Sequence, residues 1–270
     1  MAQSPNPHLF SGSLLIGCAI SSAMYGTLCG QISWYFGRFS KDHIYMRGLV
    51  AFISLTETGH FISISAALWY NVIQRGQNMP WDKFTRCIPF AFHFARPLEE
   101  MTCFMVEGFF IRRMWIFAQQ KRLAQFTILP FLLGWGFTIA YLVGMVRYPC
   151  YPAMARNRPI LVISYGFRIV SDGLISWTMI YSLFKHSSGI GFTSSVRTIR
   201  GLAGWIITTG LLMWLSSIAF IVAQLCVGNT LIPAAIYMLR GRLYANAMLA
   251  QCVPYLYCSN ISIYLGNHVG

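Results

Sequence analysis

The chain has 270 residues, of which 56% are hydrophobic and only 10% are charged, and its mean hydropathy is +0.55. Soluble domains carry about 25% charged residues, so this chain lacks the polar surface that a water-soluble globule needs. Its formal net charge of +13 would suggest nucleic-acid binding in a soluble protein, but the Lys and Arg residues gather in short segments between long apolar runs. This pattern is typical of multi-pass helical membrane proteins, so we expect the lipid bilayer, and not nucleic acid, as the partner.

Seven apolar stretches approach the length of about 20 residues that a helix needs to cross the hydrocarbon. Residues Met1 to Phe10 contain no Lys or Arg, which a cleaved signal peptide would show, so we expect the first stretch to remain as an anchor. We predict an all-α fold, a single domain over residues 1–270 forming an integral membrane bundle of seven transmembrane helices, with a short tail at 251–270. The expected spans are residues 14–36, 48–71, 88–111, 126–146, 160–184, 202–227 and 230–250.

The first span is rich in small residues, at Gly17, Ser21, Gly26 and Gly30. Small side chains let helix backbones approach each other closely inside a membrane. We therefore expect this part of the first helix to pack against a neighbouring helix.

The second span places ionisable residues in the middle of an apolar helix. Thr56, His60 and Ser63 stand at i, i+4 and i+7 and form one polar stripe, with Glu57 beside it. A charged side chain at the centre of a bilayer costs about 3 kcal/mol or more, so it needs a partner. Glu57 and His60 are spaced to hydrogen-bond each other along the helix, and we expect this local pair.

The third stretch is the least apolar, because it holds one basic residue, three acidic residues and a proline. A lone helix of this composition would insert poorly into lipid. Packed among six other helices, its charges can face the interior of the bundle, so we retain it as a span. The residues concerned are Arg96, Pro97, Glu99, Glu100 and Glu107.

Two further pairs of opposite charge stand four residues apart on single expected helices. They are Arg96 with Glu100 in the third span and Arg168 with Asp172 in the fifth. Side chains at this spacing meet on a helix surface. We therefore expect these charges to be satisfied within their own helices.

Loop cations set the expected orientation of the bundle. With the N-terminus outside, the segments facing the cytoplasm carry twice as many Lys and Arg residues as those facing the exterior. Because cytoplasmic loops are enriched in these residues, we predict an exterior N-terminus and a cytoplasmic C-terminus, in the plasma membrane or an endomembrane. The cytoplasmic set is Arg38, Lys41, Arg47, Arg112, Arg113, Lys121, Arg122, Lys185, Arg197, Arg200, Arg240 and Arg242, and the exterior set is Arg75, Lys83, Arg86, Arg147, Arg156 and Arg158.

Cys87 and Cys150 would both face the exterior in this orientation, one at the start of the third span and one after the fourth. Seven-helix receptors commonly join these two places by a disulfide bond, which an oxidising compartment permits. A disulfide and two unpaired thiols are both open. No CxxC or Cys/His spacing in the sequence indicates a metal site.

The sequence carries no recognisable enzyme motif. It contains no GxSxG, HExxH or P-loop pattern. A membrane zinc hydrolase needs about three ligands, whereas His60 and His93 lie on different expected helices. No lysine follows Lys185, so the last span lacks the lysine that a retinal Schiff base requires. We predict no catalytic residue, no cofactor and no bound metal.

Three interpretations of the intramembrane charges are open. They can hold the helices together, they can line a ligand pocket or a switch, or they can form a path for protons or ions. Glu107 has no cation at i±4, so we expect it to be neutral or paired across helices, for instance with His60. We favour a receptor-like or scaffold-like protein with a small-molecule or protein ligand; the alternative is a proton- or ion-coupled transporter that uses Glu57, His60, Glu107 and Asp172. The candidate polar site comprises Glu57, His60, Glu107, Arg168 and Asp172.

Several segments together resemble a large family of fungal, mostly basidiomycete, seven-helix membrane proteins catalogued as a domain of unknown function. The resemblance covers residues 12 to 250 and implies seven helices with an exterior N-terminus, but no activity, because the family has none assigned. The segments that carry it are Gly12–Gly17, Glu57–His60, Val106–Phe110 with Arg113–Trp115, Thr208–Leu212 and Arg242–Ala250.

The chain departs from this family pattern at a few positions. Family members usually have Gln where Glu107 stands and Ser where Ala245 and Ala247 stand. They continue past the last segment with Leu-Asn-x-Arg and a polar, Ser-rich tail, whereas this chain continues with Gln251-Cys252-Val253-Pro254. We therefore expect the segment 251–270 to be truncated or altered.

Overall fold

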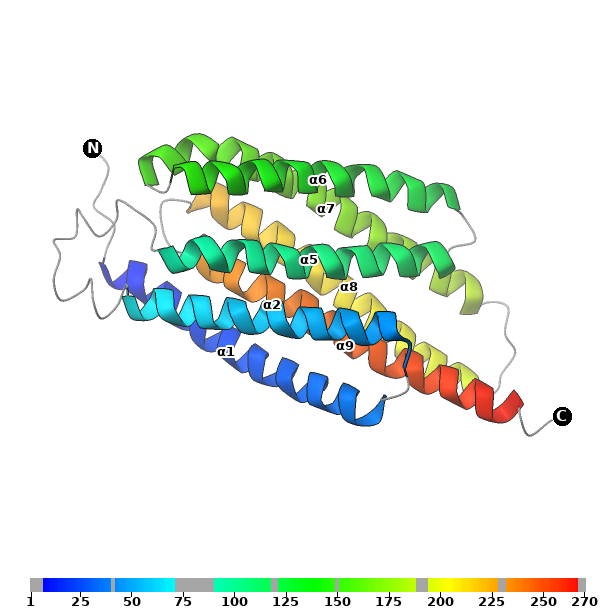
Figure 1. Cartoon of the computed structure of the whole chain (residues 1–270). Helices are drawn as coiled ribbons and strands as arrows, with labels where there is room; N and C mark the ends of the chain where they lie inside the picture. The colour runs from blue at the N-terminus through cyan, green and yellow to red at the C-terminus, as the bar shows by residue number, and fades with distance from the viewer. Residues whose placement is uncertain are drawn as a thin grey trace.

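The computed structural model describes residues 7–39, 42–70, 90–117, 121–148, 151–187, 194–227 and 232–266. Within these ranges the protein is all-helical and has seven helices, which confirms the predicted fold class. Each expected span corresponds to one helix. The helices are α1 (Pro7–Arg38), α2 (Ile44–Trp69), α5 (Phe90–Phe117), α6 (Lys121–Arg147), α7 (Tyr151–Ser187), α8 (Ser194–Cys226) and α9 (Ile232–Gly266) (Figure 1).

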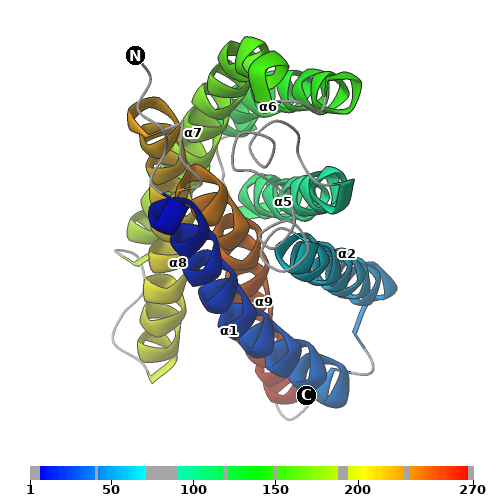
Figure 2. The ribbon, with the colours of Figure 1, turned by 90° about the vertical axis from the view of Figure 1, so that its left-hand side faces the viewer.

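The seven helices run along one common direction and form an elongated bundle (Figure 1). Helices α5 and α9 hold the central positions, because each packs against four others. Helix α9 contacts α1, α2, α5 and α8, whereas α5 contacts α2, α6, α7 and α9. The view along the bundle shows α9 enclosed between α1, α8 and α5 (Figure 2). Polar groups on α5 and α9 are therefore shielded from lipid by the surrounding helices.

Five of the described helices are long and apolar enough to cross a membrane: Gly12–Arg38 of α1, Ile44–Trp69 of α2, Gln125–Arg147 of α6, Asn157–Thr178 of α7 and Thr208–Cys226 of α8. This shows a multi-pass membrane protein. Helices α5 and α9 are long enough as well, but they carry several of the charges that face the bundle interior.

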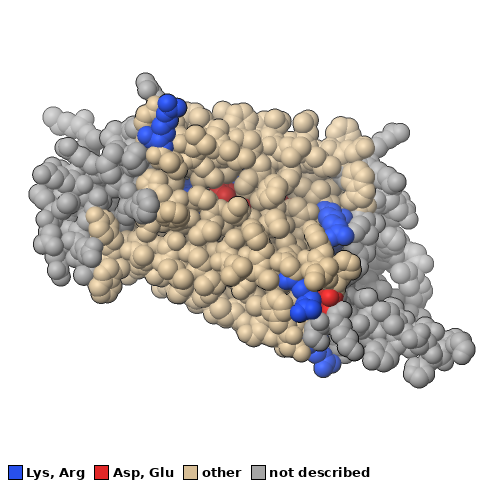
Figure 3. All heavy atoms as spheres, in the orientation of Figure 1, with Lys and Arg blue, Asp and Glu red and all other residues tan. Residues whose placement is uncertain are grey.

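The outer surface is apolar over most of its length. Figure 3 shows a broad, mostly uncharged surface with Lys and Arg groups gathered toward its two ends and a small acidic spot near its middle. Large hydrophobic side chains point outward from several helices, with Leu55 73% exposed, Phe126 70% and Trp177 68%. In water such a surface would be costly, whereas in a bilayer it is the expected one.

Helix α1 packs closely on α9 through a small residue. A Cβ atom added at Gly17 would lie 2.7 Å from the Cβ and 2.9 Å from the Cα of Ala235. One turn further on, the Ser21 hydroxyl donates to the Met238 carbonyl oxygen at 3.4 Å. The expected close contact is therefore present at Gly17 and Ser21. At Gly26 and Gly30 the expectation is wrong, because an added Cβ would meet nothing within 4 Å.

Candidate functional site

Most of the chain's acidic residues lie inside the bundle. Five of the seven are at most 3% exposed, and three arginines and one histidine are fully buried beside them. Glu57 lies midway along α2 and Arg168 midway along α7, so these charges sit near the centre of the expected membrane. The buried acids are Glu57, Glu99, Glu100, Glu107 and Asp172, and the fully buried basic residues are His60, Arg168, Arg240 and Arg242.

One group of these charges, the Glu57 group, joins α2, α5 and α9. It consists of Glu57, His60, Glu99 and Arg242. Arg242 Nε lies 2.9 Å from Glu57 Oε2, and His60 Nε2 lies 3.4 Å from Glu99 Oε2. Arg242 Nη2 also approaches His60 Nδ1 at 3.5 Å. Each of these contacts therefore links two different helices.

Gly241 makes room for the Glu57 group between two arginines of α9. A Cβ atom at this position would lie 2.6 Å from Glu99 Cγ and 3.4 Å from Glu57 Oε1. The Gly241 N–H donates to Glu99 Oε1 at 3.2 Å. Only glycine lets α9 approach α5 and α2 this closely while Arg240 and Arg242 point to separate partners.

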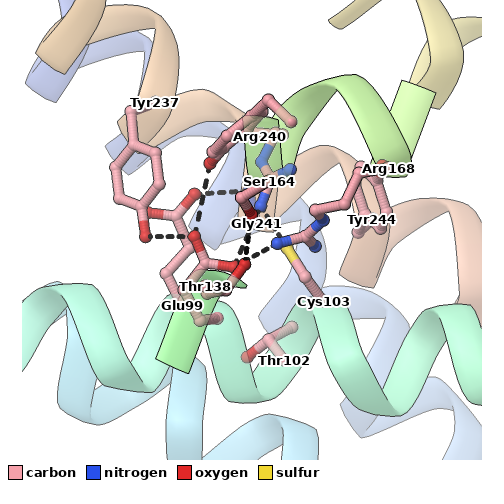
Figure 4. Close-up of polar contacts among 12 residues, drawn as sticks. Glu99, Thr102, Cys103, Thr138, Ser164, Arg168, Tyr237, Arg240, Gly241 and Tyr244 are labelled. Carbon is pink, nitrogen blue, oxygen red and sulfur yellow. Dashed lines mark hydrogen bonds and ion pairs between the residues drawn. The ribbon is translucent and has the colours of Figure 1, made fainter. Parts of the chain in front are cut away.

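A second group, the Arg168 group, joins α5, α7 and α9. It consists of Glu100, Glu107, Arg168 and Arg240. Arg168 binds Glu100 Oε2 through Nη1 and Glu107 Oε1 through Nη2, the latter at 2.6 Å. Arg240 Nη2 reaches the same Glu100 oxygen at 3.3 Å. Figure 4 shows Arg168 from α7 and Arg240 from α9 converging beside Cys103 of α5.

Aromatic residues surround the Arg168 group. Trp135 Nε1 of α6 donates to Glu107 Oε2 at 3.1 Å. The hydroxyls of Tyr165 and Tyr237 donate to Glu100 Oε1 at 3.3 and 3.2 Å. The Arg240 guanidinium also lies 4.7 Å from the centre of the Tyr165 ring. These donors and ring faces stabilise the buried charges that the arginines alone do not fully satisfy.

Asp172 has a different kind of surroundings, which we call the Asp172 cluster: Asp172, Ser217 and Tyr244. Its Oδ2 accepts from the Tyr244 hydroxyl at 2.5 Å and from the Ser217 hydroxyl at 3.0 Å. The two hydroxyls are themselves 3.2 Å apart. The cluster links α7, α8 and α9.

The expected pairs within single helices do not form. Glu57 pairs with Arg242 of α9, and His60 with Glu99 of α5, so the predicted Glu57–His60 pair is wrong. Arg168 pairs with two glutamates of α5, and Asp172 is bonded to hydroxyl groups. The predicted Arg168–Asp172 pair is therefore wrong too. The reason is that interior-facing side chains lie close to polar and charged groups of neighbouring helices.

Arg96 and Glu107 also take partners other than those expected. Arg96 is half-buried and its guanidinium lies 3.7 Å from the centre of the Tyr237 ring, rather than against Glu100. Glu107 is paired across helices, which was one of the two expectations. Its partner is Arg168 and not His60. On the polar stripe of α2, Thr56 and His60 are buried, whereas Ser63 is half-buried.

Sequence reasoning missed Arg240 and Arg242 as interior residues. They were counted among the cytoplasmic cations, although they fall within the expected seventh span, and both are fully buried in α9. Their position in the middle of a span was the available signal. Without them, the cytoplasmic set of cations still exceeds the exterior set.

A further buried contact lies nearer the other end of the bundle. Arg113 Nη1 donates to Gln251 Oε1 at 2.7 Å, and Gln251 Nε2 contacts the Thr209 hydroxyl. Gln251 begins the segment that was expected to be an altered tail, yet it is 1% exposed and connects α5, α8 and α9. No sequence signal marked it.

The expected disulfide cannot be placed, because Cys87 and Cys150 lie outside the described residues. Cys18, Cys29, Cys103 and Cys226 are free thiols. Among the described residues, no group of three or more His, Cys, Asp and Glu side chains is arranged to hold a metal ion.

A family model matches the part of the chain that carries the arginines of the network. Residues 168–251 match a family of unknown function, DUF6534. The matched segment starts at Arg168, ends at Gln251, and includes Arg240, Arg242 and the Asp172 cluster. The glutamates that pair with its arginines lie earlier in the chain. No curated protein and no solved structure matches the sequence.

Proposed function

We propose that this protein is a non-enzymatic, receptor-like membrane protein of seven spans, in which the Glu57 and Arg168 groups act as a conformational switch. The observation that carries the proposal is the number of buried polar atoms that the present pairing leaves unused. Arg240 Nε and Nη1, Arg242 Nη1 and Glu57 Oε1 have no hydrogen-bond partner among the described residues.

Unused buried donors and acceptors are expensive. Each costs about 1–3 kcal/mol, so a network that only held helices together would be better served by fewer polar atoms. A network that exchanges partners between two arrangements needs such atoms, because they become the pairing groups of the other state. The central position of α9, which contacts α1, α2, α5 and α8, would carry the exchange to most of the bundle.

Shared partners make such an exchange feasible. Arg168 and Arg240 both contact Glu100 Oε2, and Arg242 lies between Glu57 and His60. A small shift of α9 along α5 would move a guanidinium from one acceptor to the next without exposing a charge to lipid. The ligand that would favour one arrangement is a small molecule or a protein.

The proposal contains no catalytic step, because the sequence has none of the hydrolase, metalloprotease or P-loop motifs. It places the N-terminus outside and the C-terminus in the cytoplasm, in the plasma membrane or an endomembrane. Support for this orientation is the excess of loop Lys and Arg on the cytoplasmic side, which persists without Arg240 and Arg242. We further propose that the whole chain, and not only residues 168–251, belongs to the fungal seven-helix family it resembles.

A second candidate function is proton- or ion-coupled transport through Glu57, His60, Glu107 and Asp172. The observation that favours it is an excess of buried carboxyl groups over buried guanidinium groups. Membrane transporters use such acids to take up and release protons.

The Glu57→Gln variant separates these functions in purified protein reconstituted into liposomes. Proton flux is measured with a pH-sensitive dye under an imposed proton gradient. A flux that the variant abolishes would favour the transporter. For the receptor, we expect no flux, and we expect at least one compound from a panel of amino acids, organic acids, sugars and nucleosides to raise the melting temperature of the original protein but not of the variant.

The matched control is Ser63→Ala, a half-buried polar residue on the same helix outside the Glu57 group. It should leave both flux and ligand stabilisation unchanged. If Glu57→Gln lowers only expression and melting temperature, with no flux and no stabilising compound for either protein, the charges serve assembly alone and both functions are rejected.

A further inference from the structure

The arginine contacts of the buried network are not shared evenly among its acids. The Arg168 group and the Asp172 cluster together contain the carboxyl groups of Glu100, Glu107 and Asp172, but only the guanidinium groups of Arg168 and Arg240. A net charge enclosed by apolar helices is strongly unfavourable. Arg96 also acts on Glu100, so the carboxyl group without an arginine contact of its own is the candidate to hold a proton.

The hydrogen-bond partners identify which carboxyl group can hold the proton. Guanidinium and indole N–H groups only donate, so an oxygen that faces them must accept. Glu107 faces Arg168 with Oε1 and Trp135 with Oε2, so both of its oxygens accept from N–H donors. Glu100 places Oε2 against two arginines, which stabilise its negative charge.

Asp172 alone of the three is bonded to hydroxyls instead of N–H donors. Ser217 and Tyr244 can each donate or accept, so their contacts with Oδ2 suit a neutral carboxylic acid as well as a carboxylate. We propose that Asp172 is a proton-binding site, and that its carboxyl group is protonated at neutral pH in the folded protein.

The geometry of the Asp172 cluster favours a proton over a metal cation. Its three oxygens are separated by 2.5, 3.0 and 3.2 Å, so they are hydrogen-bonded directly to one another. The Asp172 and Tyr244 oxygens are closer than two ligands of one metal ion, so a proton fits between them and a cation does not.

Burial and the charge of Glu107 favour a neutral Asp172, whereas Arg168 and Arg240 favour its ionised form. Glu107 of α5 faces it with a negative charge, whereas the positive charges of Arg168 on its own helix and Arg240 of α9 are engaged by glutamates. Arg96, the next cation, is half-buried and rests on the Tyr237 ring. Ser217 of α8 and Tyr244 of α9 complete the surroundings. Loss of the proton would leave an uncompensated negative charge where α7, α8 and α9 meet.

Infrared spectroscopy of the full-length protein in lipid nanodiscs tests this inference without any variant. The chain contains only three aspartates, Asp42, Asp82 and Asp172, so labelling all aspartates with 13C at the carboxyl group is selective. At neutral pH we expect a carbonyl band of a protonated acid that shifts on labelling. A spectrum in which no such band shifts would overturn the proposal.

Two variants assign the band and give a second readout. Asp172→Asn mimics the neutral acid, so it should remove the band while keeping the melting temperature within about 2 °C of the original protein or above it. Glu107→Gln, the comparison for stability, removes a carboxylate that Arg168 contacts, so it should lower the melting temperature by about 6 °C or more. Equal losses of melting temperature in both variants would show that Asp172 is ionised.

The pH dependence has a definite sign. An aspartate in the unfolded chain loses its proton above a pH of about 4, whereas the folded protein retains one at Asp172, so folding takes up a proton. Stability should therefore fall with rising pH across the neutral range, and more steeply in the original protein than in Asp172→Asn. Identical pH profiles would contradict the proposal, whether the protein proves to be a receptor, a transporter or neither.

Discussion

At the scale of single residues, the arginines determine how the interior charges are satisfied. Arg168 contacts two carboxylates, and its guanidinium also lies 4.6 Å from the centre of the Trp135 ring. A cation of different shape cannot replace Arg168, because only the planar, forked guanidinium group reaches both glutamates at once. The cost of losing it falls mainly on the acids that remain.

We predict that Arg168→Met destabilises the protein by about 3–5 kcal/mol, because Glu100 and Glu107 would be left with too few cations in an apolar interior. The measurement is thermal or denaturant unfolding in detergent. The exposed Arg112, whose guanidinium lies 4.5 Å from the Tyr45 ring centre, provides the control. Arg112→Met should cost less than about 1 kcal/mol.

A double variant sharpens this prediction. Adding Glu107→Gln to Arg168→Met removes one of the orphaned acids, so part of the lost stability should return. If the two losses simply add, the Arg168–Glu107 contact does not carry the stability assigned to it.

At the scale of helices, α9 is the element on which the bundle depends. It packs against the small residue Gly17 of α1 and supplies both arginines of the Arg240-Gly241-Arg242 sequence. Its Tyr244 hydroxyl donates a hydrogen bond to Asp172. Close approach at Gly17 and Gly241 is what lets these side chains reach their partners. Without that proximity the charges would face apolar side chains or lipid.

We predict that Gly17→Ala lowers stability by about 1–3 kcal/mol, because the new methyl group would overlap the backbone of Ala235 and force α1 away from α9. The melting temperature in detergent is the measurement. Gly30→Ala is the matched control on the same helix: its added Cβ meets nothing within 4 Å, and alanine favours the helix by about 1 kcal/mol. A similar loss in both variants would mean that helix contact is not the cause.

At the scale of the whole molecule, five described helices suffice to make a multi-pass membrane protein, and α5 and α9 complete the proposed seven spans. An odd number of spans puts the two termini on opposite sides of the membrane. The orientation itself is testable at the sequon Asn260-Ile261-Ser262.

We predict that no glycan is attached at Asn260 when the protein is expressed in a eukaryotic cell, because the proposed orientation places it in the cytoplasm. Mobility on a gel before and after glycosidase treatment is the measurement. A sequon engineered at the exterior end, within residues 71–89, is the positive control. A glycan at Asn260 would show that the orientation is the reverse of the one proposed.

The sequence predicted the helices well and their polar contacts poorly, for physical reasons. Span length and hydropathy are properties of each segment alone, so the seven helices could be read directly. The partners of Glu57, His60, Glu107 and Asp172 depend on which helices adjoin, and spacing along one helix carries no information about that. Gly241 and Gln251 matter only through residues far away in the chain.

The order of charges along the chain has a consequence for synthesis. In every arginine ion pair described, the acid lies on α2 or α5 and the arginine on α7 or α9. A ribosome therefore delivers the glutamates to the membrane well before the arginines that neutralise them. Until α7 and α9 follow, the acids of α2 and α5 lack the arginines that they contact in the folded bundle, and an unpaired charge inside a bilayer is costly.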